Sequence, residues 1–532
     1  DPSLPLQNFM AKKITLAPEQ LFLKAQISEK KRDWKSAINF YKSAVKLRPN
    51  YVEAHHNLAI VLRHEGQKEG ALISAQTAAN LTPEHPTIQF SLGVSLELMG
   101  KNKDAIGAYK KSLGLRPDYI SALNNLGRLL DLQGLNQEAI SVLKRSLALA
   151  PNSTEAIINL SNAYLSVGKP EQTNKLLQPL ISNKTDKSNT SMGIAYNSLG
   201  VAAQILSQTN QAVKYFKKAI EKIPDFAEAH ENLAQTLLFQ GMYRKAWVEY
   251  EWRWKNQSNA QSKRKFDGIL WNGSDLSNKI LLVHAEQGFG DVIQFARFLS
   301  LIDIQNGKIL LACHPALTNL LSTLPSVHKV VDINDALPTY NAHIPLLSLP
   351  RLLEISESNI PSSSYLTAKP SNVVEDTKKI KIGITWAGKP RHQSDPYRNR
   401  SCPIEIFEPL LNISGIKLFS LQTGPNKVEL KKIDDTSLIT DLSDGIESFA
   451  DTASLICELD ILITIDTAVA HLAGSLGKRV WILLSKSSDW RWNIRDKRNI
   501  WYPTARIFKQ RTEGNWSEPF DDIIAELKKL IP

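Results

Sequence analysis

The sequence predicts an α-helical repeat domain followed by two α/β units with parallel sheets. Two observations carry this prediction: a period of 34 residues that runs through the first half, and an alternation of strand and helix patterns from Lys279 onward. The chain has 532 residues, of which 42% are hydrophobic and 22% charged, so several packed domains are expected and a mainly disordered chain is excluded.

A proline recurs every 34 residues in the first half, with an alanine twelve residues before it and a small residue seven positions after that alanine. The prolines are Pro49, Pro83, Pro117 and Pro151, and the alanines are Ala37, Ala71, Ala105 and Ala139. Small residues let two helices approach closely, and a proline ends the second helix of each pair. The register shifts by about five residues around Lys184–Ser191 and then resumes. We therefore expect about seven helix pairs over residues 16–260, the fifth of them degenerate.

This pattern closely resembles the tetratricopeptide repeat (TPR), which implies an α-solenoid whose concave surface binds a partner. The sixth position of successive repeats carries asparagine or serine, and we take four asparagines as candidate acceptor-groove residues: Asn57, Asn125, Asn159 and Asn232. A row of amides can clamp the backbone of an extended peptide, because each amide both donates and accepts hydrogen bonds. The alternative is that asparagine is simply common at this position of such repeats.

Composition narrows the compartment and the partners. No stretch approaches 18 consecutive apolar residues and no basic segment precedes an apolar one at the N-terminus, so neither a membrane span nor a signal peptide is expected. Three widely spaced cysteines favour neither a disulfide framework nor a zinc module, and we expect a cytoplasmic protein. Of the net charge of +11, residues 1–260 carry +10 and residues 261–532 carry +1. The surplus predicts an acidic or anionic partner for the repeats, unless it is only a charged surface.

The second half is expected to hold two doubly wound units, at residues 279–370 and 378–532, after a linker at residues 261–278. Residues 1–15 match no repeat and are expected to be unstructured or foreign to the native chain. The expected strands are Ile280–Ala285, Lys308–Cys313, His328–Ile333, Lys381–Trp386, Lys417–Gln422, Ile461–Ile465 and Arg479–Leu484. Helices are expected at Phe289–Ile304, at Pro315–Leu324 and, with a serine cap, at Ser517–Leu530.

Four segments follow the carboxyl ends of these strands, where ligands bind in such sheets. The first ends in Gly290 and Asp291, and its glycines allow a tight turn that presents a carboxylate; the alternative is that Asp291 only caps a helix. The second is a basic loop with Lys389, Arg391 and Arg400, which favours phosphate recognition, although a solvated loop holds such residues by chance as well.

The third segment opens a helix, whose first amides and hydroxyl would face an anion; it contains Asp466, Thr467, Ala468 and His471. We expect His471 either to pack against neighbouring side chains or to hydrogen-bond a diphosphate bound at this helix. The fourth segment carries Trp490 and Arg491, which are candidates to contact a base or sugar, or else to cover the domain edge. Gln422, at the end of an expected strand, is a further candidate for nucleotide binding.

Together these segments resemble glycosyltransferases with two facing Rossmann-like domains, the GT-B fold. The Gly290-Asp291 turn and the Asp466–Ala473 element look most like bacterial heptosyltransferases (family 9). The order of repeats before the transferase resembles bacterial TPR glycosyltransferases related to the protein O-GlcNAc transferases (family 41). The resemblance implies Asp291 as the catalytic base, Arg400 on the donor phosphates, and Asp466, Thr467 and Ala468 on the nucleotide sugar.

The expected activity is therefore a nucleotide-sugar-dependent glycosyltransferase that inverts the anomeric centre, with a protein or peptide acceptor held by the repeats. No Asp-x-Asp pair occurs in the chain, so we expect neither a metal nor a cofactor beyond the nucleotide-sugar co-substrate. Two alternatives stay open: a catalytically silent scaffold that only binds nucleotide, and a transferase acting on a glycan or a lipid-linked saccharide. A nucleic-acid partner is not expected, because no interleaving of basic and aromatic residues accompanies the charge.

Overall fold

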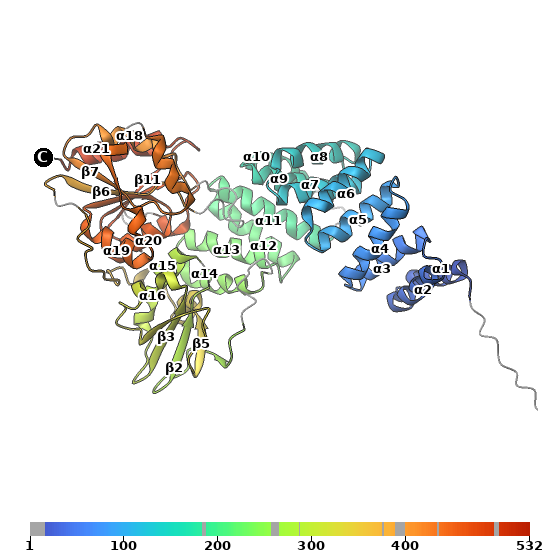
Figure 1. Ribbon diagram of the computed structural model, residues 1–532, viewed down its shortest axis with the longest axis horizontal. Helices are drawn as coiled ribbons and strands as arrows, with labels where there is room; N and C mark the ends of the chain where they lie inside the picture. Colours follow the sequence, from blue (N-terminus) through green and yellow to red (C-terminus); the bar gives the residue numbers. More distant parts are fainter. Residues whose placement is uncertain are drawn as a thin grey trace, which may run out of the picture. The chain divides into compact units, whose positions relative to one another are not determined.

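The computed structural model describes residues 16–182, 188–256, 265–286, 288–374, 377–388, 400–433, 436–493 and 499–531. The chain forms two compact units, residues 1–186 and 187–532. Figure 1 traces the order of the elements within each unit.

The first unit is built from antiparallel helix pairs. Its helices are α1 (Pro18–Lys30), α2 (Trp34–Leu47), α3 (Val52–His64), α4 (Lys68–Leu81), α5 (Pro86–Leu98), α6 (Asn102–Leu115), α7 (Ile120–Leu132), α8 (Asn136–Leu149), α9 (Thr154–Ser166) and α10 (Pro170–Ser182). The repeated alanine of each second helix, such as Ala71 or Ala105, is completely buried. Between the helices of a pair, Gly66 and Gly100 take φ angles of 70° and 72°, a conformation that glycine adopts without strain.

The second unit begins with two more helix pairs: α11 (Asn189–Ile205) with α12 (Thr209–Lys222), and α13 (Ala227–Phe239) with α14 (Tyr243–Tyr250). Ser207, with φ of 60°, occupies the turn position that Gly168 occupies in the preceding helix pair. The two residues are 39 positions apart, five more than the period of 34. Most of this insertion lies in α11, which has 17 residues where α9 has 13. A 3₁₀ helix at Glu251–Trp254 then ends the helical part of the chain before the sheets.

Two parallel sheets follow in the second unit. The first has the strand order β1-β5-β2-β3-β4 and the second β11-β10-β9-β6-β7-β8. The strands are β1 (Ile269–Leu270), β2 (Ile280–His284), β3 (Lys308–Cys313), β4 (Lys329–Asp332), β5 (Ala342–Pro345), β6 (Ile380–Ile384), β7 (Ile416–Ser420), β8 (Ile439–Asp441), β9 (Ile461–Ile465), β10 (Val480–Leu484) and β11 (Ala505–Lys509). In the first sheet β3 and β4 lie on one side of β2 and β5 lies on the other; in the second sheet β7 and β8 lie on one side of β6 and β9 lies on the other. The strand order therefore reverses between β2 and β5 and between β6 and β9. Open α/β sheets bind ligands at such switch points.

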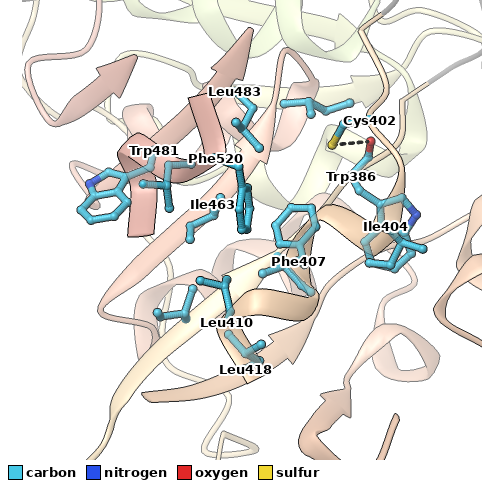
Figure 2. Packing of buried hydrophobic residues seen from close by; sticks show 14 of the residues in the cluster. Trp386, Cys402, Ile404, Phe407, Leu410, Leu418, Ile463, Trp481, Leu483 and Phe520 are labelled. Atoms are coloured by element: carbon cyan, nitrogen blue, oxygen red, sulfur yellow. Dashed lines mark hydrogen bonds between the residues drawn. The ribbon is translucent and has the colours of Figure 1, made fainter. Parts of the chain in front are cut away.

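Helices connect and cover these strands. They are α15 (Phe289–Phe295), α16 (Pro315–Leu321), α17 (Leu349–Leu352), α18 (Glu408–Leu411), α19 (Phe449–Glu458), α20 (Ala468–Ser475) and α21 (Ser517–Lys528). The core beneath the second sheet joins strand residues such as Ile463 and Leu483 to Phe407 and Phe520, whose rings meet edge to face with centroids 5.2 Å apart (Figure 2). Burial of these side chains from both faces explains why the strands are continuous apolar runs.

Two local expectations are wrong. Ser517 is the first residue of α21 rather than its cap: Trp516 occupies the cap position in the helical region, and its side chain makes no capping bond. The helix expected at Phe289–Ile304 is an α-helix only as far as Phe295, and the next residues, Ala296–Leu301, form a 3₁₀ helix. The α-helix is therefore shorter than expected. In the described ranges no helix combines the length and apolar content needed to cross a membrane.

The close approach of the paired helices gives a stability test. A Cβ added to Gly93 of α5 would lie 2.5 Å from a ring carbon of Tyr109 in α6, whereas one added to Gly107 of α6 meets nothing within 4 Å. We expect Gly93→Ala to lower the free energy of unfolding by about 1–3 kcal/mol through overpacking. Gly107→Ala should instead raise it by roughly 0.5–1 kcal/mol, because alanine favours the helix. Urea unfolding followed by circular dichroism distinguishes the two; equal effects would contradict the packing argument.

Candidate functional site

The candidate site lies where the helices that follow both switch points meet. After β2 the chain passes Glu286 and starts α15 at Phe289; after β9 it passes Asp466 and Thr467 and starts α20 at Ala468. The helices pack directly on each other, because a Cβ on Gly290 would lie 2.8 Å from His471 Cδ2 and 3.5 Å from the Cα of Ala468. The missing side chain of Gly290 therefore allows the contact that brings Asp291 to the second sheet.

Asp291 forms an ion pair with Arg491, which belongs to the 3₁₀ helix Trp490–Trp492 after β10. Arg491 Nη2 donates to Asp291 Oδ1 at 2.6 Å, and Arg491 Nε donates to Gln294 Oε1 at 2.7 Å. Arg491 Nη1 donates to Asp489 Oδ1 at 3.0 Å. Residues from both sheets thus share one guanidinium, and the Asp291 side chain remains 23% exposed. Asp291 is bonded to Arg491, and the cap position of α15 is Gly288, so the structure gives no support to a purely capping role.

Burial dominates the electrostatics of this group. Burial raises the pKa of the Asp291 carboxyl above its ordinary value, and the nearby Asp489 acts in the same direction, while Arg491 and Arg400 act against them. Burial also holds the pKa of His471 well below its usual range, with Arg491 adding to the effect. At neutral pH His471 is therefore uncharged. It is 4% exposed, its ring lies tilted against that of Trp492 with centroids 4.7 Å apart, and its Nδ1 bonds the Tyr502 hydroxyl at 3.0 Å. These contacts favour a packing role, and a hydrogen bond to a diphosphate stays a prediction.

The predicted residues of the second sheet gather at its switch point. Asp466 Oδ1 accepts a bond from Trp492 Nε1 at 2.7 Å, and Asp466 Oδ2 lies 3.4 Å from Arg400 Nε. Thr467 precedes Ala468 at the start of α20, and its hydroxyl lies 3.4 Å from that of Thr464. The start of α20 thus carries a hydroxyl and sits beside an arginine that is paired with Asp466.

Gln422 and Trp490, two of the predicted site residues, are held in position by contacts with neighbouring protein groups. Gln422 Oε1 accepts bonds from the backbone N–H groups of Trp386 and Ala387 at 3.0 and 2.9 Å, so it fixes the segment that follows β6. Trp490 is 3% exposed and packs against Trp247 and Trp501, and the guanidinium of Arg491 lies over its ring. Lys389 and Arg391 lie outside the described residues.

The repeat asparagines are largely used inside the solenoid. Asn57 and Asn125 donate to the hydroxyls of Tyr41 and Tyr109 at 3.1 and 3.3 Å. In the second unit, Asn232 donates to Asn197 Oδ1 at 3.1 Å. Asn159 is half-buried, and its Nδ2 has no hydrogen-bond partner within the described part of the chain. These bonds tie neighbouring helices together and favour a structural role for Asn57, Asn125 and Asn232; a role in peptide binding stays a prediction.

A buried ion pair that sequence reasoning missed occupies the switch point of the first sheet. Arg253, in the 3₁₀ helix after α14, donates to both carboxylate oxygens of Glu286, at 2.7 and 3.1 Å, and to Ser348 Oγ at 2.8 Å. Arg253 and Glu286 are 2% and 4% exposed. Glu286 also accepts a bond from the backbone of Leu347, which follows β5. The end of the helical repeats is thereby anchored where the first sheet would otherwise present a ligand site.

Other members of the site also escaped the sequence analysis. Gln294 lies three residues after Asp291, so helical spacing alone places it on the same face, and this signal was available. Asp489 lies in the fourth of the segments expected at the strand ends, but it was not proposed as a site residue. Tyr250 carried no such signal, because its position depends on how helix α14 packs. Tyr250 lies near Asp291, whose charge, after burial, raises the pKa of the Tyr250 hydroxyl. Among the described residues no group of three or more histidine, cysteine, aspartate or glutamate side chains is arranged to hold a metal ion.

Comparison with known proteins identifies the repeats. Models of the tetratricopeptide repeat match residues 40–73, 90–154, 194–226 and 215–248. The chain contains tetratricopeptide repeats. Protein FlbA of Caulobacter vibrioides is 22% identical over 407 residues, which cover 64% of this chain and 68% of FlbA.

Among solved structures, similarity is found to a tetratricopeptide repeat protein from Parabacteroides merdae, with 20% identity and a TM-score of 0.40 over 46% of this chain and 94% of that one. MamA protein is 23% identical with a TM-score of 0.26, over 38% of this chain and 91% of its own.

The contact between α15 and α20 can be tested with a pair of glycines. Gly290→Ala should lower the free energy of unfolding by about 1–3 kcal/mol, because the added methyl group collides with His471. At Gly288 the nearest atom to an added Cβ is Asp291 Oδ2 at 3.8 Å, so Gly288→Ala should change stability by no more than about 0.5 kcal/mol. Chemical denaturation of both variants measures the difference, and a tolerated Gly290→Ala would contradict close packing here.

The ion pair of Arg253 and Glu286 predicts strong coupling. Arg253→Met should lower the free energy of unfolding by about 3–5 kcal/mol, because it leaves a buried carboxylate unpaired. Adding Glu286→Gln should recover part of this loss. Arg351→Met is a matched control: Arg351 is 41% exposed and lies 3.7 Å from Glu251, so its loss should cost less than about 1 kcal/mol. A double-mutant cycle with denaturant unfolding measures the coupling, and strictly additive effects would refute it.

Proposed function

We propose that the second half of the chain is a nucleotide-sugar-dependent glycosyltransferase of the GT-B type, which acts on an acceptor bound by the TPR solenoid. The observation that carries the proposal is the meeting of Asp291, from the first sheet, with Arg491, Asp466 and the start of α20, from the second. A carboxylate after a strand of one sheet and an anion-binding helix start at the edge of the other suit an inverting transfer from a diphosphate donor.

Each group has a defined part in the proposed reaction. Asp291 takes the proton from an acceptor hydroxyl or amide as the acceptor atom attacks the anomeric carbon. The bond from that carbon to the diphosphate oxygen breaks on the opposite face, so the configuration inverts. A pKa raised by burial suits Asp291 to this task, because a base works best when its pKa approaches the working pH.

The leaving diphosphate is stabilised by positive charge and by backbone dipoles. Arg400, the hydroxyl of Thr467 and the first N–H groups of α20 supply these, and the proposal extends to Lys389 and Arg391 of the predicted basic loop. Gln422 supports them indirectly, since it holds the backbone of Trp386 and Ala387 at the same edge. Asp466 orients Arg400 and Trp492 within this group.

The repeats supply the acceptor site in this proposal. TPR solenoids bind extended peptides, and residues 1–260 hold 32 basic against 22 acidic side chains, which favours an acidic protein or peptide. Binding of such an acceptor should weaken as salt is raised from 0.05 to about 0.5 M, because screening shortens the reach of surface charges. Fluorescence anisotropy with acidic and neutral peptides of equal length measures this effect. Salt-independent binding would refute the electrostatic part of the proposal.

One observation favours the alternative of a silent scaffold. The carboxylate of Asp291 is already paired with Arg491, and a base that stays paired is a poor acceptor of protons. A scaffold of this kind would bind nucleotide without transferring sugar.

Substitution of Asp291 separates the two. Asp291→Asn should abolish release of nucleoside diphosphate from sugar nucleotides while leaving nucleotide binding intact, because the amide cannot accept the proton. Binding is read from thermal shifts: a ligand at 100 times its dissociation constant adds about 2.7 kcal/mol of stability. Asp521→Asn, on the exposed face of α21, is the matched control and should keep wild-type turnover. Full turnover by Asp291→Asn refutes the assignment, and nucleotide binding without turnover by the wild type supports the scaffold.

A further inference from the structure

We propose that Arg491 is the positioning residue of Asp291: it holds the carboxylate of the first sheet from a loop of the second sheet, so the base is oriented only when both sheets contribute. This inference rests on the proposed glycosyltransferase function and deepens it. In the sequence Arg491 is a candidate to contact a base or sugar, whereas the structure gives its guanidinium a different set of neighbours.

The guanidinium of Arg491 is held on every side. Its Nη2 and Nε donate to Asp291 and Gln294, which lie three residues apart on one face of α15. Its Nη1 donates to Asp489, and its plane lies over the ring of Trp490, with 4.2 Å from the guanidinium carbon to the ring centroid. The backbone carbonyl of Arg491 accepts a bond from Asn499 Nδ2 at 2.8 Å. Such a set of bonds fixes a single rotamer, and the planar fork of arginine allows it where lysine does not.

This arrangement makes Arg491 a link between the sheets rather than a free anion receptor. Two of its three side-chain bonds go to α15, after β2, and one goes to its own segment after β10. Because Asp291 directly follows Gly290 in the first turn of α15, any shift of α15 against the segment after β10 breaks these bonds together. The orientation of the base is thereby tied to the packing of α15 on α20, and an error of about 1 Å in such a group can reduce a rate by about 10²-fold.

The charges around Asp291 decide what loss of Arg491 would do. The groups that face the carboxylate are Arg491 and Asp489 after β10, Arg400 after β6, Asp466 after β9, and Tyr250 at the end of α14. Arg491 is the strongest of those that favour the ionised carboxylate. Removing this cation raises the pKa of Asp291 further, so the acid limb of the activity profile, which rises as Asp291 loses its proton, moves to higher pH.

Three variants of the full chain test the proposal. Arg491→Gln should lower kcat by about 10²-fold with the KM for the sugar nucleotide changed by less than about threefold, and should move the acid limb of the kcat profile to higher pH. Arg491→Lys keeps the charge and loses the fork, so it should restore the position of the limb but only part of kcat. Arg506→Gln, an arginine of β11 that pairs with Glu526 and is 51% exposed, is the charge-matched control and should match the wild type.

The outcomes are separable. A large rise in the KM for the sugar nucleotide with an unmoved pH profile would overturn the inference, since Arg491 would then contact the donor. Wild-type kinetics in Arg491→Gln would overturn it as well.

If the wild type transfers no sugar, the proposed function fails, and the positioning contact is read from melting temperatures alone. Arg491→Gln should then lower the melting temperature less in an Asp291→Asn background than in the wild type. Equal shifts in both backgrounds would show that the two residues do not act together and would overturn the inference.

Discussion

The architecture of the second unit depends on one buried ion pair, between Arg253 at the end of the helical repeats and Glu286 after β2. Both side chains are almost fully buried, and the pair is bidentate. Ser348 Oγ, the Tyr250 carbonyl and Glu251 accept further hydrogen bonds from the arginine. Two desolvated charges are tolerated only with such complete bonding, and loss of either partner is costly. Since Glu286 lies five residues before Asp291, the pair that anchors the repeats to the first sheet also fixes the start of the segment that carries the candidate base.

The same stretch of repeat reaches the second sheet through aromatic packing. Trp247 of α14 meets Trp490 edge to face at 6.0 Å, and its Nε1 donates to the carbonyl of Ile355 at 3.1 Å. Asn493 donates to the carbonyl of Phe239 at the end of α13. The last helix pair therefore contacts segments that follow strands of both sheets. The ion pair of Asp291 with Arg491 joins α15 directly to the 3₁₀ helix after β10.

Elements with a strong periodic pattern were predicted well, whereas short strands and contacts between distant segments were not. The expected strands are found within one or two residues of their bounds, because most of them are apolar runs buried on both faces. The exception is β4, which is only partly buried. The strands β1, β5, β8 and β11 were missed, since two to five residues with mixed polarity carry no period to recognise. Of the site, Asp291, Asp466 and Arg491 were singled out by their place after strands, but no pattern indicated that Arg491 pairs with Asp291 across 200 residues.

The sequence by itself determined the repeats, the parallel sheets and the segments that hold the candidate site residues, because periodicity and strand ends are local properties of the chain. Only the tertiary structure decided which of these segments meet. The sequence indicates Gly290 only as a turn residue. In the fold it contacts His471, which leaves no room for a Cβ at this position. Arg253 and Tyr250 lie within the range expected for the repeats, and in the fold they contact or adjoin residues of the candidate site. The physical reason is that burial and pairing depend on distances between segments, which no local pattern encodes.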